Sequence, residues 1–219
     1  MSHDGAGRVI VVAFDGIVAD TLPPRARALA EAIAHEWAPL GIEVPASDLL
    51  PLLPGRTFDE CVTIAVQQRP ALQHAQVRDD ITGHELVAMR AQRDWAKAAA
   101  HGVPLRDRVL DHVQKLVARG VRLVVRSDSQ RRDVEPLLRL AGLEDIMLFL
   151  RCADDLPRTA GVTTLQASYD AIDARLERLR IPWVQRDAVE VPGGAAARML
   201  LESAGPRYFL HADLWSKSS

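Results

Sequence analysis

Three polar residues lie a few positions beyond apolar runs in this chain, and their side chains are the first candidates for chemistry. Asp15 comes soon after the run at 9–13, Ser127 follows a second run at 121–125, and Asp187 follows a shorter one. In open parallel sheets, ligands bind at the carboxyl ends of the strands. A serine between a strand and a helix also places its hydroxyl beside a helix N-terminus, which binds anions readily. These positions therefore form a candidate site.

Each candidate also has a purely structural explanation. Asp15 is suited to capping a turn through Gly16, Ser127 is an ordinary helix N-cap, and the pattern around Asp187 favours an exposed loop acid. A group of arginines close to Ser127 either binds an anion or forms a solvated basic face. The group consists of Arg126, Arg131 and Arg132.

The elements that position these residues follow from the hydrophobic pattern. Short runs rich in β-branched residues predict buried strands at 9–13, 121–125 and 146–150, with shorter strands from Trp183 and at 208–210. Segments with helical spacing separate them, and this alternation implies parallel strands joined by right-handed crossovers. The expected fold class is α/β, a Rossmann-like parallel sheet flanked by helices.

A long stretch between the first strand and the second βα unit lacks strand patterning. Residues 23–100 predict only helices, including a long polar-faced one at 77–99. We therefore expect an all-helical insertion at 23–100 in a core formed by 1–22 and 101–219.

Two local signals support helices within the insertion. Thr57 is followed three residues later by Glu60, which is the spacing of a capping box. Trp37 and Trp95 are expected in the core of this segment, whereas an exposed tryptophan there would indicate a partner surface.

Net charge, the length of the apolar runs and the cysteine spacing limit the classes of protein to which this chain could belong. The chain has 219 residues, of which 48% are apolar and 26% charged, and its formal net charge is −2. This charge gives no argument for binding nucleic acid or an anionic membrane, and no apolar run approaches the roughly 20 residues of a membrane span. Cys61 and Cys152 are far apart and lack motif spacing, so we expect free thiols in a reducing cytoplasm.

The sequence around Asp15 resembles the first motif of the haloacid dehalogenase (HAD) superfamily. That motif usually reads Phe-Asp-x-Asp-Gly-Thr-(apolar)-x-Asp-(Ser/Thr). The residues that fit are Phe14-Asp15-Gly16 and Val18-Ala19-Asp20-Thr21. The order of elements resembles the subgroup of phosphoglycolate phosphatase and β-phosphoglucomutase, which implies that the helical insertion is a cap.

The resemblance implies roles for the candidate residues. Asp15 falls on the family's general acid and base, and Ser127 on its phosphate-binding hydroxyl, with Asp128 contributing beside it. A Mg²⁺ cofactor is implied, with Asp187 and Asp15 as the ligands that this chain retains. A small phosphorylated ligand is the implied small-molecule partner.

The sequence departs from the family where the chemistry is done. Ala13 stands at the position of the nucleophilic aspartate, Ile17 at that of a threonine, and Arg158 to Tyr169 contains no lysine for the third motif. Alanine has no oxygen to attack phosphorus or bind a metal, and loss of a covalent nucleophile costs on the order of 10⁶ in rate.

We therefore expect a catalytically degenerate HAD-like protein, a pseudo-phosphatase that acts as a binding, regulatory or assembly subunit with a protein partner. A phosphate or anion site at Ser127 is the part of the family site that we expect it to retain. The alternative is a phosphohydrolase or phosphomutase in which Asp15 replaces the missing nucleophile. An unrelated α/β fold remains the third interpretation.

Overall fold

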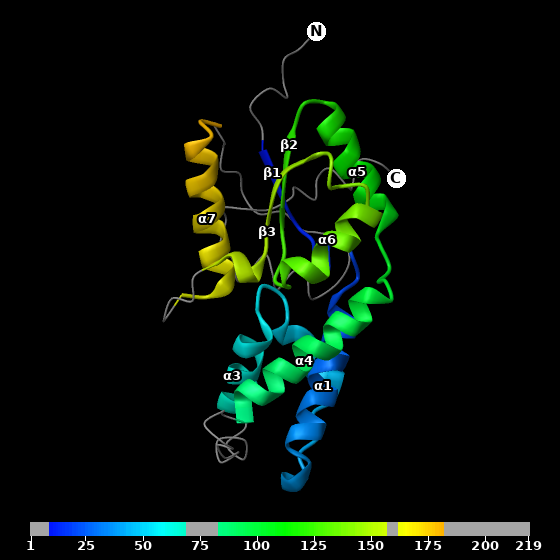
Figure 1. Ribbon diagram of the computed structural model, residues 1–219, viewed down its shortest axis with the longest axis vertical. Helices are drawn as coiled ribbons and strands as arrows, with labels where there is room; N and C mark the ends of the chain where they lie inside the picture. Colours follow the sequence, from blue (N-terminus) through cyan, green and yellow to red (C-terminus); the bar gives the residue numbers. More distant parts are fainter. Residues whose placement is uncertain (1–8, 69–82, 157–161, 182–219) are drawn as a thin grey trace.

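Three parallel strands form the sheet in a computed structural model that describes residues 9–68, 83–156 and 162–181 (Figure 1). They are β1 (Val9–Ala13), β2 (Arg122–Arg126) and β3 (Met147–Arg151), with β2 in the middle. The α/β class is thus confirmed, and β2 and β3 each begin one residue later than the hydrophobic runs predict.

The register brings the carboxyl ends of the strands to one edge. Ala13 pairs with Arg126, and Arg126 pairs with Arg151. The hydrogen bonds continue past the strands, since Phe14 N donates to Arg126 O at 2.7 Å and Ser127 N donates to Arg151 O at 2.8 Å. The loops after β1 and β2 therefore begin side by side.

Helices cover both faces of the sheet (Figure 1). On one face, Val11, Val124 and Phe149 pack against α7 (Thr164–Arg178). On the other, alternate strand residues such as Val12 and Val125 join the apolar core that includes α5 (Asp107–Ala118) and α6 (Arg131–Leu140). Alternation along each strand thus explains why the runs are apolar throughout.

The described residues within 23–100 form helices and turns beyond the carboxyl edge of the sheet (Figure 1). Trp37 and Trp95 are buried there, as predicted. The assignment of this segment as a cap domain stays a prediction. Its helices are α1 (Leu22–Glu36), α2 (Ala46–Leu49), α3 (Phe58–Gln68) and α4 (Gly83–Ala100), with 3₁₀ turns at Ala38–Leu40 and Leu50–Leu52.

Two chain segments connect the helical part to the sheet and run next to each other. Asp20 N donates to Pro104 O at 2.8 Å, and Arg106 N donates to Val18 O at 2.9 Å. Asp20 and Arg106 also form a partly exposed ion pair at 3.2 Å. No helix in the described ranges is long and apolar enough to cross a membrane.

The start of α6 corrects one expectation. Its N-cap is Gln130, whose side chain makes no capping hydrogen bond, so Ser127 does not cap this helix. Arg131 N instead donates to Asp154 Oδ1 at 2.9 Å, from the 3₁₀ turn Ala153–Asp155 after β3. The predicted strands after residue 182 and the predicted helix residues 77–82 lie outside the described residues.

Candidate functional site

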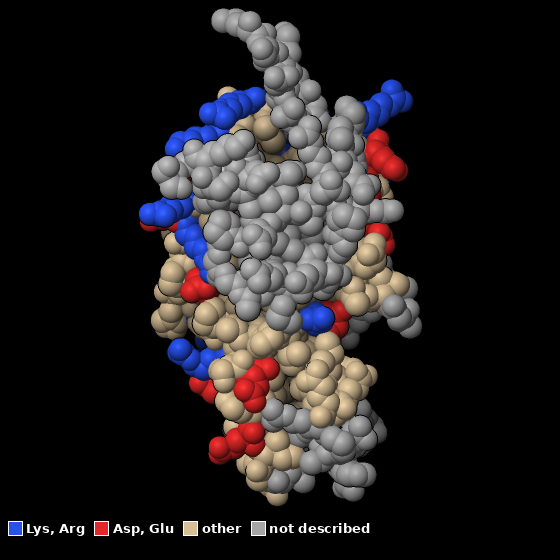
Figure 2. All heavy atoms as spheres, turned by 180° about the vertical axis from the view of Figure 1, so that it is seen from behind, with Lys and Arg blue, Asp and Glu red and all other residues tan. Residues whose placement is uncertain are grey.

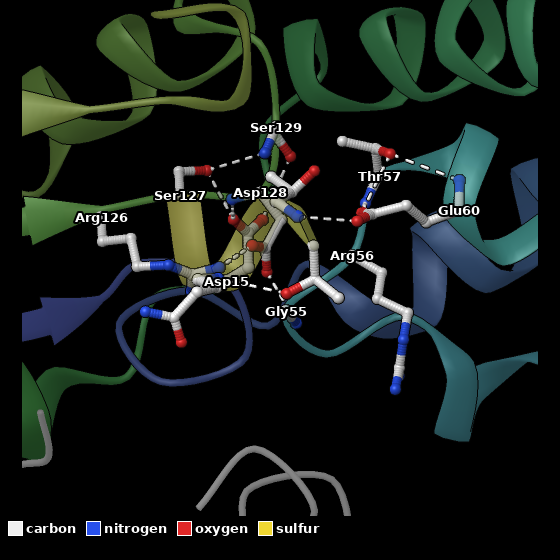
Figure 3. A network of polar contacts seen from close by, with 12 residues as sticks. Asp15, Gly55, Arg56, Thr57, Glu60, Arg126, Ser127, Asp128 and Ser129 are labelled. Carbon is white, nitrogen blue, oxygen red and sulfur yellow. Dashed lines mark hydrogen bonds and ion pairs between the residues drawn. The ribbon is translucent and has the colours of Figure 1, made fainter. Parts of the chain in front are cut away.

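The Asp15 carboxylate lies just beyond the carboxyl ends of β1 and β2 and is fully buried (Figure 3). Its Oδ1 accepts hydrogen bonds from Thr21 Oγ1 at 2.9 Å and Ser129 Oγ at 3.2 Å. Its Oδ2 accepts from Asp128 N at 2.8 Å and from the Ser127 hydroxyl. A carboxylate has about four lone-pair sites, so these four donors use all of them.

A tight turn after β1 arranges this coordination. Gly16 adopts a φ of +75°, and its N–H donates to Ala19 O at 2.8 Å. A β-carbon at Gly16 would lie 2.7 Å from Leu22 Cδ1. Only glycine therefore combines the positive φ with the absence of a side chain that this position requires. Ile17 is buried in the apolar core. The turn therefore returns Thr21 to the carboxylate that begins the loop.

Arg25, at the end of the first turn of α1, supplies the positive charge next to Asp15. Its Nη1 lies 3.7 Å from Asp15 Oδ1, and both side chains are almost completely buried. Arg25 Nη2 donates to Arg56 O at 2.9 Å, and the guanidinium carbon lies 5.2 Å from the centre of the Phe58 ring. The helical segment thus places a cation at the edge of the sheet.

These contacts keep Asp15 ionised despite its burial. Burial alone raises the pKa of a carboxyl group. The Arg25 charge and the hydrogen bonds from Ser127, Asp128 and Thr21 outweigh burial, and they hold the Asp15 pKa below its usual range.

A second buried ion pair lies next to the first. Arg126 and Asp128 form an ion pair, and the Arg126 guanidinium lies 5.5 Å from the centre of the Tyr169 ring. Asp128 Oδ2 also accepts a hydrogen bond from Gly55 N at 2.9 Å. Burial nevertheless raises the pKa of Asp128, assisted by the nearby Asp15 charge and opposed by Arg126.

Gly55 belongs to a loop that joins the helical segment to the site (Figure 3). The capping box predicted after it is confirmed, because Thr57 N donates to Glu60 Oε2 at 2.8 Å and Glu60 N to the Thr57 hydroxyl at 3.4 Å. The other oxygen of Glu60 accepts from Thr164 N at 2.7 Å, at the start of α7. The loop and the first turn of α3 therefore contact the core through Gly55 and Glu60 respectively.

The described residues do not fit a bound Mg²⁺. A metal ion needs free lone pairs on oxygen ligands, and both oxygens of Asp15 already accept two hydrogen bonds each. The adjacent cationic Arg25 would repel a second cation, and the Asp128 carboxylate is occupied by Arg126 and Gly55 N. No group of three or more potential ligands lies together in the described ranges. Asp187 lies outside them, so its predicted metal role stays a prediction.

The structure brings together Asp15, Ser127 and Asp128, as the sequence predicts. The phosphate-binding roles of Ser127 and Asp128 stay predictions, but the Ser127 hydroxyl and the Asp128 amide donate to Asp15 here. The prediction of an exposed basic face is wrong for Arg126. This residue is buried because Asp128 and Tyr169 enclose its guanidinium. Arg131 instead pairs with Asp155 and Glu135 at the surface.

Sequence reasoning missed several members of the site. Thr21 ends the first motif and Ser129 follows Asp128 directly, and their short polar side chains were the available signal. Arg25 and Gly55 carried none, because both come from the helical segment and only its packing places them against the sheet. The missed members are Thr21, Arg25, Gly55 and Ser129.

The cysteines near the site give a testable chemical prediction. Cys61 and Cys152 are free and buried, as the sequence predicted for free thiols. Burial raises the pKa of Cys61 to about 12 and also raises that of Cys152. Because the thiolate is the reactive form, a disulfide reagent at pH 8 should label the native protein about 10³-fold more slowly than an exposed cysteine. Both thiols should react after denaturation, and rapid labelling of either in the native state would contradict this burial.

Similar folds occur in solved structures of phosphatases and a phosphomutase. A predicted phosphoglycolate phosphatase from Haemophilus somnus superimposes with a TM-score of 0.64 at 13% identity, covering 98% of this chain and 92% of the other. A predicted phosphatase from Clostridium acetobutylicum gives 0.61 at 17% identity, covering 97% and 98%. A β-phosphoglucomutase from Clostridium difficile gives 0.56 at 12% identity, covering 91% and 81%.

These likenesses establish the fold, which is that of haloacid dehalogenase superfamily phosphatases and phosphomutases. The sequence itself matches no protein-family model and no curated protein. The resemblance at Asp15 is therefore confirmed at the level of fold, while the vacant nucleophile position at Ala13 stays a prediction from the motif.

Proposed function

We propose that this protein, which has the fold of HAD-superfamily phosphatases, is a non-catalytic member of that fold, a binding, regulatory or assembly subunit. The observation that carries the proposal is the coordination of Asp15. A general acid or base must exchange a proton with substrate, and a nucleophile must have a free lone pair. The four hydrogen bonds to Asp15 leave neither available.

The motif departures support the same conclusion. Ala13, at the expected nucleophile position, has no oxygen, and Ile17 is packed into the apolar core rather than directed at a ligand. The two buried carboxylates, Asp15 and Asp128, are balanced by the two buried guanidinium groups of Arg25 and Arg126. A phosphate dianion would add uncompensated negative charge to this balanced set.

The second candidate is a phosphohydrolase or phosphomutase acting on a small phosphorylated metabolite. It is favoured by the structural neighbours, which are described as phosphatases and a β-phosphoglucomutase. In this reading Asp15 must leave its hydrogen bonds during turnover and act as the nucleophile.

Hydrolysis of p-nitrophenyl phosphate with Mg²⁺ separates these functions. We expect the wild type and Asp15→Asn to show the same rate as a protein-free control, at a temperature where both are folded. Asp20→Asn is the matched control, because Asp20 lies in the same loop and is half exposed. Turnover that survives Asp20→Asn and disappears in Asp15→Asn would establish the enzyme instead.

Under the proposed function, the ligand is a protein and the binding surface lies outside the buried site. On the face shown in Figure 2, basic and acidic side chains both lie along the described surface, so charge does not select a nucleic acid there. The formal net charge of −2 likewise gives no argument for a nucleic acid, and affinity capture from native cells would test for the protein partner.

A further inference from the structure

We propose that Arg25 is the built-in counter-cation of Asp15, and that its guanidinium closes this position to a divalent metal ion. The inference rests on the proposed non-catalytic role, because a HAD-type enzyme would require the Asp15 side chain to be accessible. It goes further by assigning a function to a residue of the helical segment for which the sequence gave no signal.

The contacts of Arg25 show that Asp15 is its main anionic partner. Arg25 is 1% exposed, and its Nη1 faces Asp15 Oδ1 at 3.7 Å. Neither Nη1 nor Nε has a hydrogen-bond partner among the described residues, while Nη2 donates to the neutral Arg56 carbonyl. A buried charge is costly unless it is paired, so the Asp15 carboxylate is the group that compensates this guanidinium.

The protein itself supplies both the anion and the cation that a bound ligand or metal ion would otherwise supply. The Asp15 carboxylate is the anion that accepts hydrogen bonds from the hydroxyls of Ser127 and Ser129 and from the Asp128 amide. Arg25 then provides the positive charge that a carboxylate in a metal site receives from the ion. The cluster of charges is neutral overall without any bound group.

This arrangement also joins the helical segment to the sheet. Arg25 comes from α1 and Asp15 from the loop after β1, so their ion pair crosses between the two parts of the fold. The Gly55–Asp128 and Glu60–Thr164 hydrogen bonds cross at neighbouring points. Loss of Arg25 should therefore destabilise the whole chain as well as open the cation position.

Thermal unfolding with Mg²⁺ tests the assignment, against NaCl of equal ionic strength. The variants are Arg25→Ala, the double variant Asp15→Asn/Arg25→Ala, and Arg27→Ala as the control, since Arg27 is exposed on the same helix. Arg25→Ala should lower the Tm by roughly 10 °C, because it leaves a buried carboxylate without its partner. Arg27→Ala should change the Tm by less than about 2 °C.

The Mg²⁺ response is the specific readout. The wild type and Arg27→Ala should melt at the same temperature in both salts. Arg25→Ala should gain about 3–5 °C from Mg²⁺ at roughly ten times its dissociation constant, because without the guanidinium the hydroxyls of Thr21, Ser127 and Ser129 can rotate and release lone pairs of Asp15 to the ion. The double variant should lose this gain, because it lacks the carboxylate.

Two results would overturn the proposal: a Mg²⁺ gain in Arg25→Ala no greater than in the wild type, or a gain in the double variant as large as in Arg25→Ala. If Arg25→Ala does not fold, Arg25→Lys replaces it. Lysine keeps the charge, so a Mg²⁺ gain in either Arg25→Lys or the wild type would then refute the assignment, and no gain in both would support it. These melting temperatures do not depend on phosphatase turnover. Failure of the proposed function would appear in the p-nitrophenyl phosphate assay, and failure of the Arg25 assignment would appear in the melting temperatures.

Discussion

Asp15→Asn is expected to lower the free energy of unfolding by about 3–5 kcal/mol, because it leaves the buried Arg25 charge without its carboxylate. The asparagine NH₂ would also face a donor, since every lone pair of Asp15 is used by hydroxyl or amide donors. Urea denaturation checks this value. The result would assign Asp15 a structural role instead of the catalytic one implied by the family motif.

The matched control for this change is Asp20→Asn. Asp20 pairs with Arg106 at 3.2 Å, with both side chains about one-third to two-fifths exposed. Exposed pairs of this kind contribute about 0–1 kcal/mol. Equal losses in the two variants would show that the burial of Asp15 has no special energetic weight.

The free energy of unfolding at acidic pH should also depend on the Asp15 carboxylate. The folded-state pKa of Asp15 lies below its ordinary value of 3.8, so its contribution is present above that value and is lost as the pH falls through the lower folded pKa. The difference in unfolding free energy between the wild type and Asp15→Asn should therefore narrow as the pH falls below about 4. A constant difference down to the acid limit would contradict the depressed pKa.

Arg126→Met is expected to cost a similar amount, about 3–5 kcal/mol near neutral pH, since it leaves Asp128 as an unpaired buried carboxylate. Methionine keeps much of the apolar contact with Tyr169, so the loss reports mainly on the charge. The matched control is Arg122→Met, because Arg122 lies at the exposed start of the same strand. Chemical denaturation of both variants provides the measurement.

The pH dependence of Arg126→Met distinguishes a charge effect from a packing effect. The Asp128 pKa is already raised by burial in the wild type, and removal of Arg126 should raise it further. A raised folded-state pKa makes stability fall as the pH rises through the interval above the unfolded value. The cost of the substitution should therefore be smaller at pH 4 than at pH 8. A pH-independent cost would assign the loss to packing alone.

The sequence determined the fold of the described residues because local patterns decide it. The β-branched runs that became β1, β2 and β3 can be buried only between two layers, and their alternation with amphipathic helices requires parallel strands. The Thr57–Glu60 capping box and the turn at Gly16 were also readable, since each depends on residues a few positions apart. The sequence further placed Asp15, Ser127 and Asp128 at one edge of the sheet.

Only the tertiary structure decided which groups Asp15, Ser127 and Asp128 contact. Asp15 is separated from Arg25 by ten positions and from Asp128 by more than a hundred, and Gly55 is separated from Asp128 by 73. No local pattern encodes these contacts. The packing of the helical segment brings Arg25 and Gly55 to the strand ends, where burial removes water and makes charge pairing compulsory. The physical reason for the difference is that sequence periodicity reports which faces are buried, whereas the partner of a buried charge depends on which distant segments meet there.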